Sequence, residues 1–212
     1  MMSLKSTFAV KEIFYTIQGE GAQAGRAAVF CRFAGCNGWS GLSKDRAKGP
    51  FPCSRWCDTE FVGGRKIDED SLVAEIIALF PERGHRFVVF TGGEPALQLT
   101  DSLLKKLLKD VPQIAIETNG SLPLPEQAFV GNCWITVSPK NEKIAQDKAS
   151  ELKLIYPTLD PELFKDFRAS WRFLQPLHDL NWTKNTQAAV AYVKQHPEWR
   201  LSIQSHKYLG LA

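Results

Sequence analysis

Three cysteines, Cys36, Cys53 and Cys57, fall within one short stretch of the chain that is also rich in Gly, Ser, Lys and Pro. The chain has five cysteines, an odd number, and clustered cysteines in a cytosolic chain bind metal or do chemistry more often than they form disulfides. Iron–sulfur clusters ordinarily take four cysteines, so a cluster held by three leaves one iron free for a ligand. An open coordination position is what distinguishes catalytic metal sites from closed structural ones.

The rest of the chain alternates short β-rich apolar runs with longer helical patterns, which predicts βαβ units and a parallel sheet. Four leucines at helical spacing mark an amphipathic helix that Thr100 or Asp101 would cap. Strands are expected at Ala28–Phe33, Phe87–Phe90, Ile114–Glu117, Trp134–Val137, Leu152–Tyr156, Arg172–Leu174 and Trp199–Ile203. Helices are expected at Glu69–Phe80, Asp101–Asp110, Pro161–Ala169 and Lys184–His196.

Polar motifs follow these predicted strands, and in α/β folds the carboxyl ends of parallel strands are where sites are built. The motifs are Thr91–Pro95, Glu117–Gly120, Ser138–Lys140, Gln175–Pro176 and Gln204–Lys207. A full eight-stranded barrel needs roughly 250 residues, more than the 212 present. The sequence therefore predicts an α/β fold, a shortened or partial (βα) TIM-like barrel, as a single domain over residues 1–212.

Composition excludes several classes of protein. Hydrophobic residues make up 44% and charged residues 23% of the chain, values typical of globular proteins and not of disordered ones. The net charge of +3 is too small for a nucleic-acid footprint, and no apolar run approaches transmembrane length. We expect a cytoplasmic protein with neither nucleic-acid nor membrane partners.

Several motifs together resemble one family. The cysteine loop and the strand-end motifs resemble the radical S-adenosylmethionine (SAM) superfamily, and the two ends of the chain resemble the 7-carboxy-7-deazaguanine synthase family within it. The first group is Gly35-Cys36, Trp56-Cys57-Asp58-Thr59, Thr91-Gly92-Gly93-Glu94-Pro95 and Ser138-Pro139-Lys140. The second is Phe14-Tyr15-Thr16-Ile17-Gln18-Gly19-Glu20-Gly21 and Ser205-His206-Lys207-Tyr208-Leu209.

The cysteine spacing departs from the superfamily pattern in two places. The gap between Cys36 and Cys53 is much longer than usual, as it is in some members of the synthase family. The gap between Cys53 and Cys57 is one residue longer than the family's, although an aromatic residue, Trp56, still precedes the last cysteine.

The resemblance implies a 4Fe-4S cluster on Cys36, Cys53 and Cys57, with SAM as second cofactor and Mg²⁺ bound through Thr59. It implies ring contraction of 6-carboxy-5,6,7,8-tetrahydropterin with release of ammonia, on the route to queuosine and other 7-deazapurines. A flavodoxin or ferredoxin system would supply the electrons, and the chain would form a homodimer. By the same resemblance, SAM would be held by Trp56, Cys57, Asp58, Gly93, Ser138, Pro139, Lys140, Gln175, Pro176, Leu177 and His178.

The resemblance also implies that Ile17, Gln18, Gly19, Thr91 and the terminal Ala212 bind the substrate.

Two further substrate-binding residues follow from the sequence pattern. Arg32 lies within an apolar strand, on the face opposite Cys31 and Phe33, and its planar fork suits a carboxylate. We expect it to bind the substrate's carboxylate; the alternative is an ion pair with Glu20 or Glu117. Glu117 ends a buried strand, where an unpaired carboxylate is costly, and we assign it to substrate N–H groups.

Other residues stay open or are assigned to the core. His206 is either a polar contact near the site or a core histidine. Cys31 and Cys133 lie in or beside apolar strands and are expected in the core.

Two other functions compete with this assignment. Another radical SAM reaction, such as activation of a glycyl-radical partner, would share the cysteines but would not need the N-terminal motif or Arg32. A zinc-binding interaction module would need a fourth ligand from a distant residue such as Cys133 or His85.

Overall fold

The computed structural model describes residues 7–211, which form one nine-stranded sheet in the order β3-β1-β2-β4-β5-β6-β7-β8-β9. From β2 to β9 each neighbouring pair of strands is parallel, whereas β1 is antiparallel to both β2 and β3. The strands are β1 (Thr7–Ile17), β2 (Ala27–Phe33), β3 (Arg65–Asp68), β4 (Phe87–Gly92), β5 (Gln113–Thr118), β6 (Cys133–Val137), β7 (Lys148–Tyr156), β8 (Arg168–Pro176) and β9 (Arg200–Leu201).

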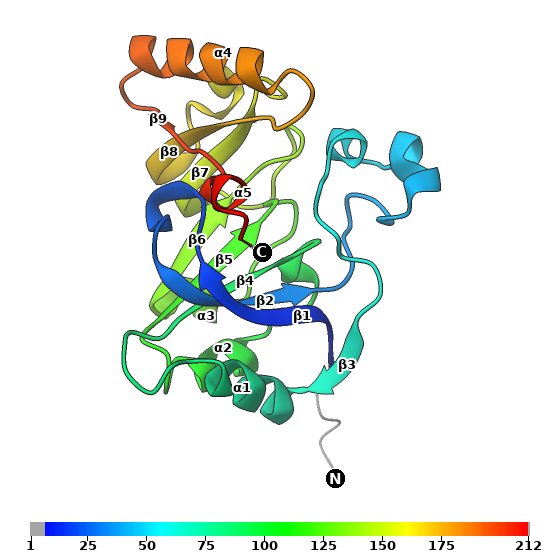
Figure 1. Cartoon of the computed structure of the whole chain (residues 1–212), viewed down its shortest axis with the longest axis vertical. Helices are drawn as coiled ribbons and strands as arrows, with labels where there is room; N and C mark the ends of the chain where they lie inside the picture. The colour runs from blue at the N-terminus through cyan, green and yellow to red at the C-terminus, as the bar shows by residue number, and fades with distance from the viewer. Residues whose placement is uncertain (1–6, 212) are drawn as a thin grey trace.

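Helices α1 and α2 lie side by side below the sheet, and α4 lies against β8 and β9 (Figure 1). The α-helices are α1 (Glu69–Ala78), α2 (Asp101–Leu107), α3 (Gln127–Val130), α4 (Trp182–Gln195) and α5 (Ser205–Leu209). Short 3-10 turns are η1 (Gly21–Gln23), η2 (Ser43–Lys48), η3 (Pro52–Arg55), η4 (Pro95–Leu97) and η5 (Pro161–Phe164). Among the described residues, no helix combines the length and the apolar character needed to cross a membrane.

The core lies between the sheet and the layer of α1 and α2. Leu103, Leu104 and Leu107 of α2 are fully buried against it, and burying a leucine contributes roughly 1.5–3 kcal/mol. The helix begins where the sequence predicts, because the Thr100 side chain accepts a hydrogen bond from the amide of Leu103. The four apolar residues that open β4, Phe87 to Phe90, are all buried, as expected for a central strand of a parallel sheet.

Two predicted elements differ from the structure. Pro161–Ala169 is a 3-10 turn ending at Phe164, followed by β8 from Arg168, because parallel pairing with β7 overrides the local helical pattern. Trp199–Ile203 contains a strand at Arg200–Leu201 alone. The strands β1 and β3, which carry the sheet past β2, were not expected.

The segment between β2 and β3 projects from the sheet, in light blue and cyan in Figure 1, and carries η2 and η3. This segment contains all three clustered cysteines. The segment begins at the carboxyl end of β2, next to the carboxyl end of β4. The polar motifs that follow the parallel strands lie at this same edge of the sheet.

Candidate active site

A cavity of about 470 Å³ opens at the carboxyl ends of the parallel strands. Its wall is made by β1, β2 and the cysteine segment on one side and by strand ends from β4 to β8 on the other. Most of the site residues expected from the sequence line it: Ile17, Gln18, Arg32, Cys36, Cys53, Trp56, Cys57, Asp58, Thr59, Thr91, Gly93, Glu117, Ser138, Lys140 and Gln175.

Five expected site residues among those described are not part of this lining. They are Gly19, Pro139, Pro176, Leu177 and His178. The carbonyl of Gly19 accepts a hydrogen bond from the amide of Ser205 at 3.0 Å, and the ring of His178 packs on that of Trp182, with centroids 4.8 Å apart. Ala212 lies outside the described residues.

The cysteine segment forms one end of the cavity. The Gly38 amide donates to Cys36 Sγ at 3.3 Å. The carbonyl of Cys53 accepts from the amides of both Trp56 (3.0 Å) and Cys57 (2.7 Å). The extra residue between the last two cysteines is thus taken up by the tight turn η3. Burial raises the pKa of the Cys36 thiol, and it raises that of Cys53 to about 11 even though Lys140 acts to lower it.

Two glycines allow β4 to meet this segment closely. Gly92 has φ +140°, a conformation that favours glycine. A Cβ at this position would clash with the backbone of Phe33. A Cβ on Gly93 would meet the carbonyl oxygen of Gly35 and lie 2.7 Å from the Cβ of Cys36. Glycine is therefore required for the strand end to lie against the first cysteine.

A half-buried lysine lies at the wall beside the cysteines. Lys140 donates to the Ser138 hydroxyl at 2.8 Å, and its Nζ lies 5.6 Å from the centroid of the Trp56 ring. Burial lowers the pKa of Lys140. The stretch that follows β6 thus places a partly desolvated cation in the cavity wall, next to thiols and an aromatic ring.

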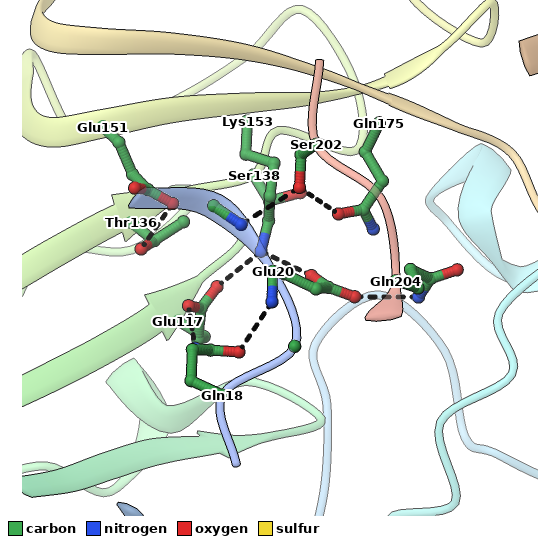
Figure 2. A network of polar contacts seen from close by, with 12 residues as sticks. Gln18, Glu20, Glu117, Thr136, Ser138, Glu151, Lys153, Gln175, Ser202 and Gln204 are labelled. Carbon is green, nitrogen blue, oxygen red and sulfur yellow. Dashed lines mark hydrogen bonds and ion pairs between the residues drawn. The ribbon is translucent and has the colours of Figure 1, made fainter. Parts of the chain in front are cut away.

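A second lysine, Lys153 of β7, is buried in the cavity lining. Figure 2 shows its network of polar contacts, which we call the floor of the cavity. Its Nζ lies 2.6 Å from Glu20 Oε2 and 3.0 Å from Glu117 Oε2, and its side chain is 4% exposed. Gln18 donates its side-chain amide to the other oxygen of Glu117 at 3.2 Å. Residues of β5, of β7 and of the turn that follows β1 therefore meet in one charged network.

The two carboxyls that share this lysine have opposite pKa shifts. Burial favours the neutral form of Glu20, but the Lys153 ammonium outweighs it and lowers the pKa to about 2. Burial raises the pKa of Glu117 and outweighs the attraction of Lys153, with Glu151 and Glu20 adding to the rise. Burial alone would lower the pKa of Lys153, but Glu117, Glu20 and Glu151 together raise it. Lys153 and Glu20 therefore form an ion pair, whereas burial favours the neutral form of Glu117.

The third carboxylate of the floor is satisfied by neutral donors. Glu151 accepts from the Ala22 amide (2.9 Å), the Trp134 indole (3.2 Å) and the Thr136 hydroxyl (3.2 Å). It belongs to the support of the floor, beneath the cavity lining.

Arg32 faces the cavity and has a partner that the sequence analysis did not name. Its Nε donates to Glu12 Oε1 at 2.6 Å, across the β1–β2 pair. The two alternatives considered, Glu20 and Glu117, are bound to Lys153 instead.

Sequence reasoning missed Lys153, although a signal was present. A lysine in the middle of the apolar run Leu152–Tyr156 is unusual, because lysine is almost never fully buried unless it is paired. Glu20 and Gln204, which bond to each other at 2.8 Å, were likewise quoted only as parts of motifs.

The short helix α5 closes the cavity from the carboxyl-terminal side. Lys207 forms an ion pair with Asp58, next to Cys57, while Gln204 and Ser205 bond to Glu20 and to the Gly19 carbonyl. His206, left open by the sequence, lines the cavity, and burial lowers its pKa. This helix therefore contacts both the cysteine end and the floor.

A scan against family models finds no match. Among curated proteins, the 7-carboxy-7-deazaguanine synthase of Burkholderia multivorans is 48% identical over 215 residues, covering 97% of this chain and 99% of its own length. The synthase of Caulobacter vibrioides is also 48% identical, with the same coverage. The chain belongs to the 7-carboxy-7-deazaguanine synthase family. The members of this family are radical SAM enzymes, so the resemblance drawn from the motifs is confirmed.

Structural comparison agrees with this membership. A crystal structure of QueE from Escherichia coli superposes with a TM-score of 0.70 at 26% identity, covering 93% of this chain and 94% of that one. The prediction of a partial barrel is confirmed, with a mostly parallel sheet that does not close. Membership in the synthase family also sets aside the two competing functions, a glycyl-radical activating enzyme and a zinc-binding module.

Proposed function

We propose that this chain converts 6-carboxy-5,6,7,8-tetrahydropterin into 7-carboxy-7-deazaguanine with release of ammonia, as a step towards queuosine and other 7-deazapurines. One observation carries the proposal beyond family membership. A single cavity brings together three thiols, the Arg32 guanidinium and the buried Glu117 carboxyl. A radical generator and a carboxylated heterocycle would require groups of these kinds.

The residues at the cysteine end fit an iron–sulfur cluster. Cys36, Cys53 and Cys57 all line the cavity. The indole N–H of Trp39, in the same lining, is buried and has no hydrogen-bond partner among the described residues. Cluster sulfurs accept such hydrogen bonds. When bound, the cluster and SAM would supply a 5′-deoxyadenosyl radical able to take hydrogen from the substrate's C6.

SAM would lie between the cysteine segment and the ends of β4, β6 and β8. Gly93 has no side chain to block the approach of SAM to Cys36. Lys140 and Ser138 offer polar atoms on the opposite wall. We assign SAM binding to Trp56, Cys57, Asp58, Gly93, Ser138, Pro139, Lys140, Gln175, Pro176, Leu177 and His178.

The substrate would lie over the floor. Arg32 is held through Nε by Glu12, which orients its guanidinium for the substrate's carboxylate. Each oxygen of Glu117 already accepts one hydrogen bond and has a second lone pair for N–H groups of the pterin. We assign substrate binding to Ile17, Gln18, Gly19, Arg32, Thr91, Glu117 and Ala212.

The hydroxyl of Thr59, in the same lining, is an oxygen ligand of the kind that Mg²⁺ takes. We propose that it binds Mg²⁺ beside the substrate. We also propose that residues 1–212 act as one radical SAM domain in a cytoplasmic homodimer, with electrons supplied by a flavodoxin or ferredoxin. The continuous sheet supports the single domain.

The reaction is tested with anaerobically purified protein, a reductant, SAM and carboxytetrahydropterin, with mass spectrometry of the products. The proposal predicts 7-carboxy-7-deazaguanine at a level that depends on all three additions. Production of 5′-deoxyadenosine without any deazaguanine would refute the substrate assignment and leave the radical chemistry standing.

A further inference from the structure

The segment between Cys36 and Cys53 is long and has little core to hold it. No residue of η2 is buried, and Leu42, which precedes it, is 41% exposed. Long loops with few buried apolar contacts open easily. Three thiols that must meet one group therefore need some other restraint on this segment.

Arg46 of η2 reaches both arms of the segment. Its Nη1 donates to the Ser54 carbonyl at 3.1 Å, and its Nη2 donates to the Cys57 carbonyl at 3.0 Å. Its own carbonyl accepts from the Ser54 hydroxyl at 2.6 Å. The two guanidinium nitrogens thus bridge the turn that contains the extra residue between Cys53 and Cys57.

The same guanidinium packs on the other arm. Its carbon lies 4.8 Å from the centroid of the Trp39 ring, three residues after Cys36. Trp39 is 5% exposed and meets the ring of Phe61 edge-on, with centroids 5.7 Å apart. Arg46 therefore connects the arm of Cys36 to that of Cys57, and Trp39 connects both to the buried ring of Phe61, which precedes β3.

We infer that Arg46 is a positioning residue that holds the two arms of the cysteine segment together before any cofactor binds. The inference rests on the proposed iron–sulfur cluster for its purpose, but the restraint itself is a property of the chain alone. The fork is essential, because two nitrogens must reach two carbonyls at once, whereas lysine offers one compact ammonium.

Limited proteolysis of the metal-free protein tests the restraint. Chymotrypsin cuts after residues such as Leu42 and Phe51 and does not depend on the substituted side chain. We expect Arg46→Gln and Arg46→Lys to be cut in this segment about tenfold faster than the wild type, since local opening costs less. Lys48→Gln is the matched control, because it removes an exposed cation of the same turn and should be cut at the wild-type rate.

The second measurement is the rate at which a chelator removes iron from the reconstituted proteins. Outer residues that orient metal ligands typically contribute 10–100-fold to metal affinity, so both Arg46 variants should lose iron at least about tenfold faster. Unchanged proteolysis, or faster proteolysis with wild-type iron loss, would overturn the inference. A wild-type protein that assembles no cluster would overturn both proposals. A cluster-bearing wild type that makes no deazaguanine, with both Arg46 effects present, would refute the substrate and leave this inference intact.

Discussion

The two ends of the cavity are built in different ways. The floor stands on adjacent strands of one sheet, and its charges are buried and paired with one another. The cysteine end is a projecting segment with two 3-10 turns, held by side-chain hydrogen bonds and one guanidinium. The floor is therefore part of the folded state's stability, whereas the cysteine end can change with little effect on folding. Four substitutions test this difference, in order of their expected effect on the free energy of unfolding.

Lys153→Met should have the largest effect. It leaves Glu20 and Glu117 without their shared cation, and breaking a buried ion pair typically costs about 3–5 kcal/mol. Urea denaturation measures the loss. Adding Glu20→Gln to Lys153→Met should restore part of the stability, since one uncompensated charge is removed. A loss below about 1 kcal/mol would show that the floor behaves like an exposed ion pair.

Glu20→Gln should remove a pH dependence. The pKa of Glu20 falls from 4.5 in the unfolded chain to about 2 in the folded protein, so the unfolded state binds more protons in this range. The resulting stability, up to about 3 kcal/mol, is complete above pH 4.5 and is lost as the pH falls towards 2. The difference in unfolding free energy between wild type and variant should shrink through this window. A difference that stays constant with pH would contradict the assigned shift.

Arg32→Ala should change the free energy of unfolding by less than about 1 kcal/mol, because the partner of Arg32, Glu12, is half-exposed. Its effect should appear in substrate binding, where loss of a charge-assisted hydrogen bond corresponds to roughly tenfold or more in affinity. Calorimetric titration of the substrate, alongside iron analysis, measures both. Loss of iron in this variant would show that Arg32 supports the cysteine end instead.

Cys57→Ala should have the smallest effect on folding and remove the cluster. The residue is half-buried in the projecting segment, so the unfolding free energy of the metal-free protein should change by less than about 1 kcal/mol. Iron and sulfide per chain should fall to background. Cys133→Ala serves as the control, because this cysteine lies in β6, away from the cavity lining, and should keep its iron.

The sequence predicted the cysteine end more completely than the floor. The cysteines and the strand-end glycines are fixed by local spacing, which a sequence displays directly. The floor depends on contacts between residues far apart in the chain, such as Lys153 with Glu20, and only the order of strands brings these together. The same reason explains why strand β1 was not predicted, because its mixed burial pattern shows no clean alternation of buried and exposed residues. It also explains why the helix predicted at Pro161–Ala169 does not form, since parallel pairing of β8 with β7 determines the structure there.

The helix α5 has a consequence for the gene as well as for the protein. Lys207 of this helix reaches Asp58 beside the cysteines, and Gln204, just before it, reaches Glu20 on the floor, so residues 204–207 connect the two ends of the cavity. A reading frame that terminates before codon 204 would discard these contacts, and we expect the resulting allele to behave as a loss of function.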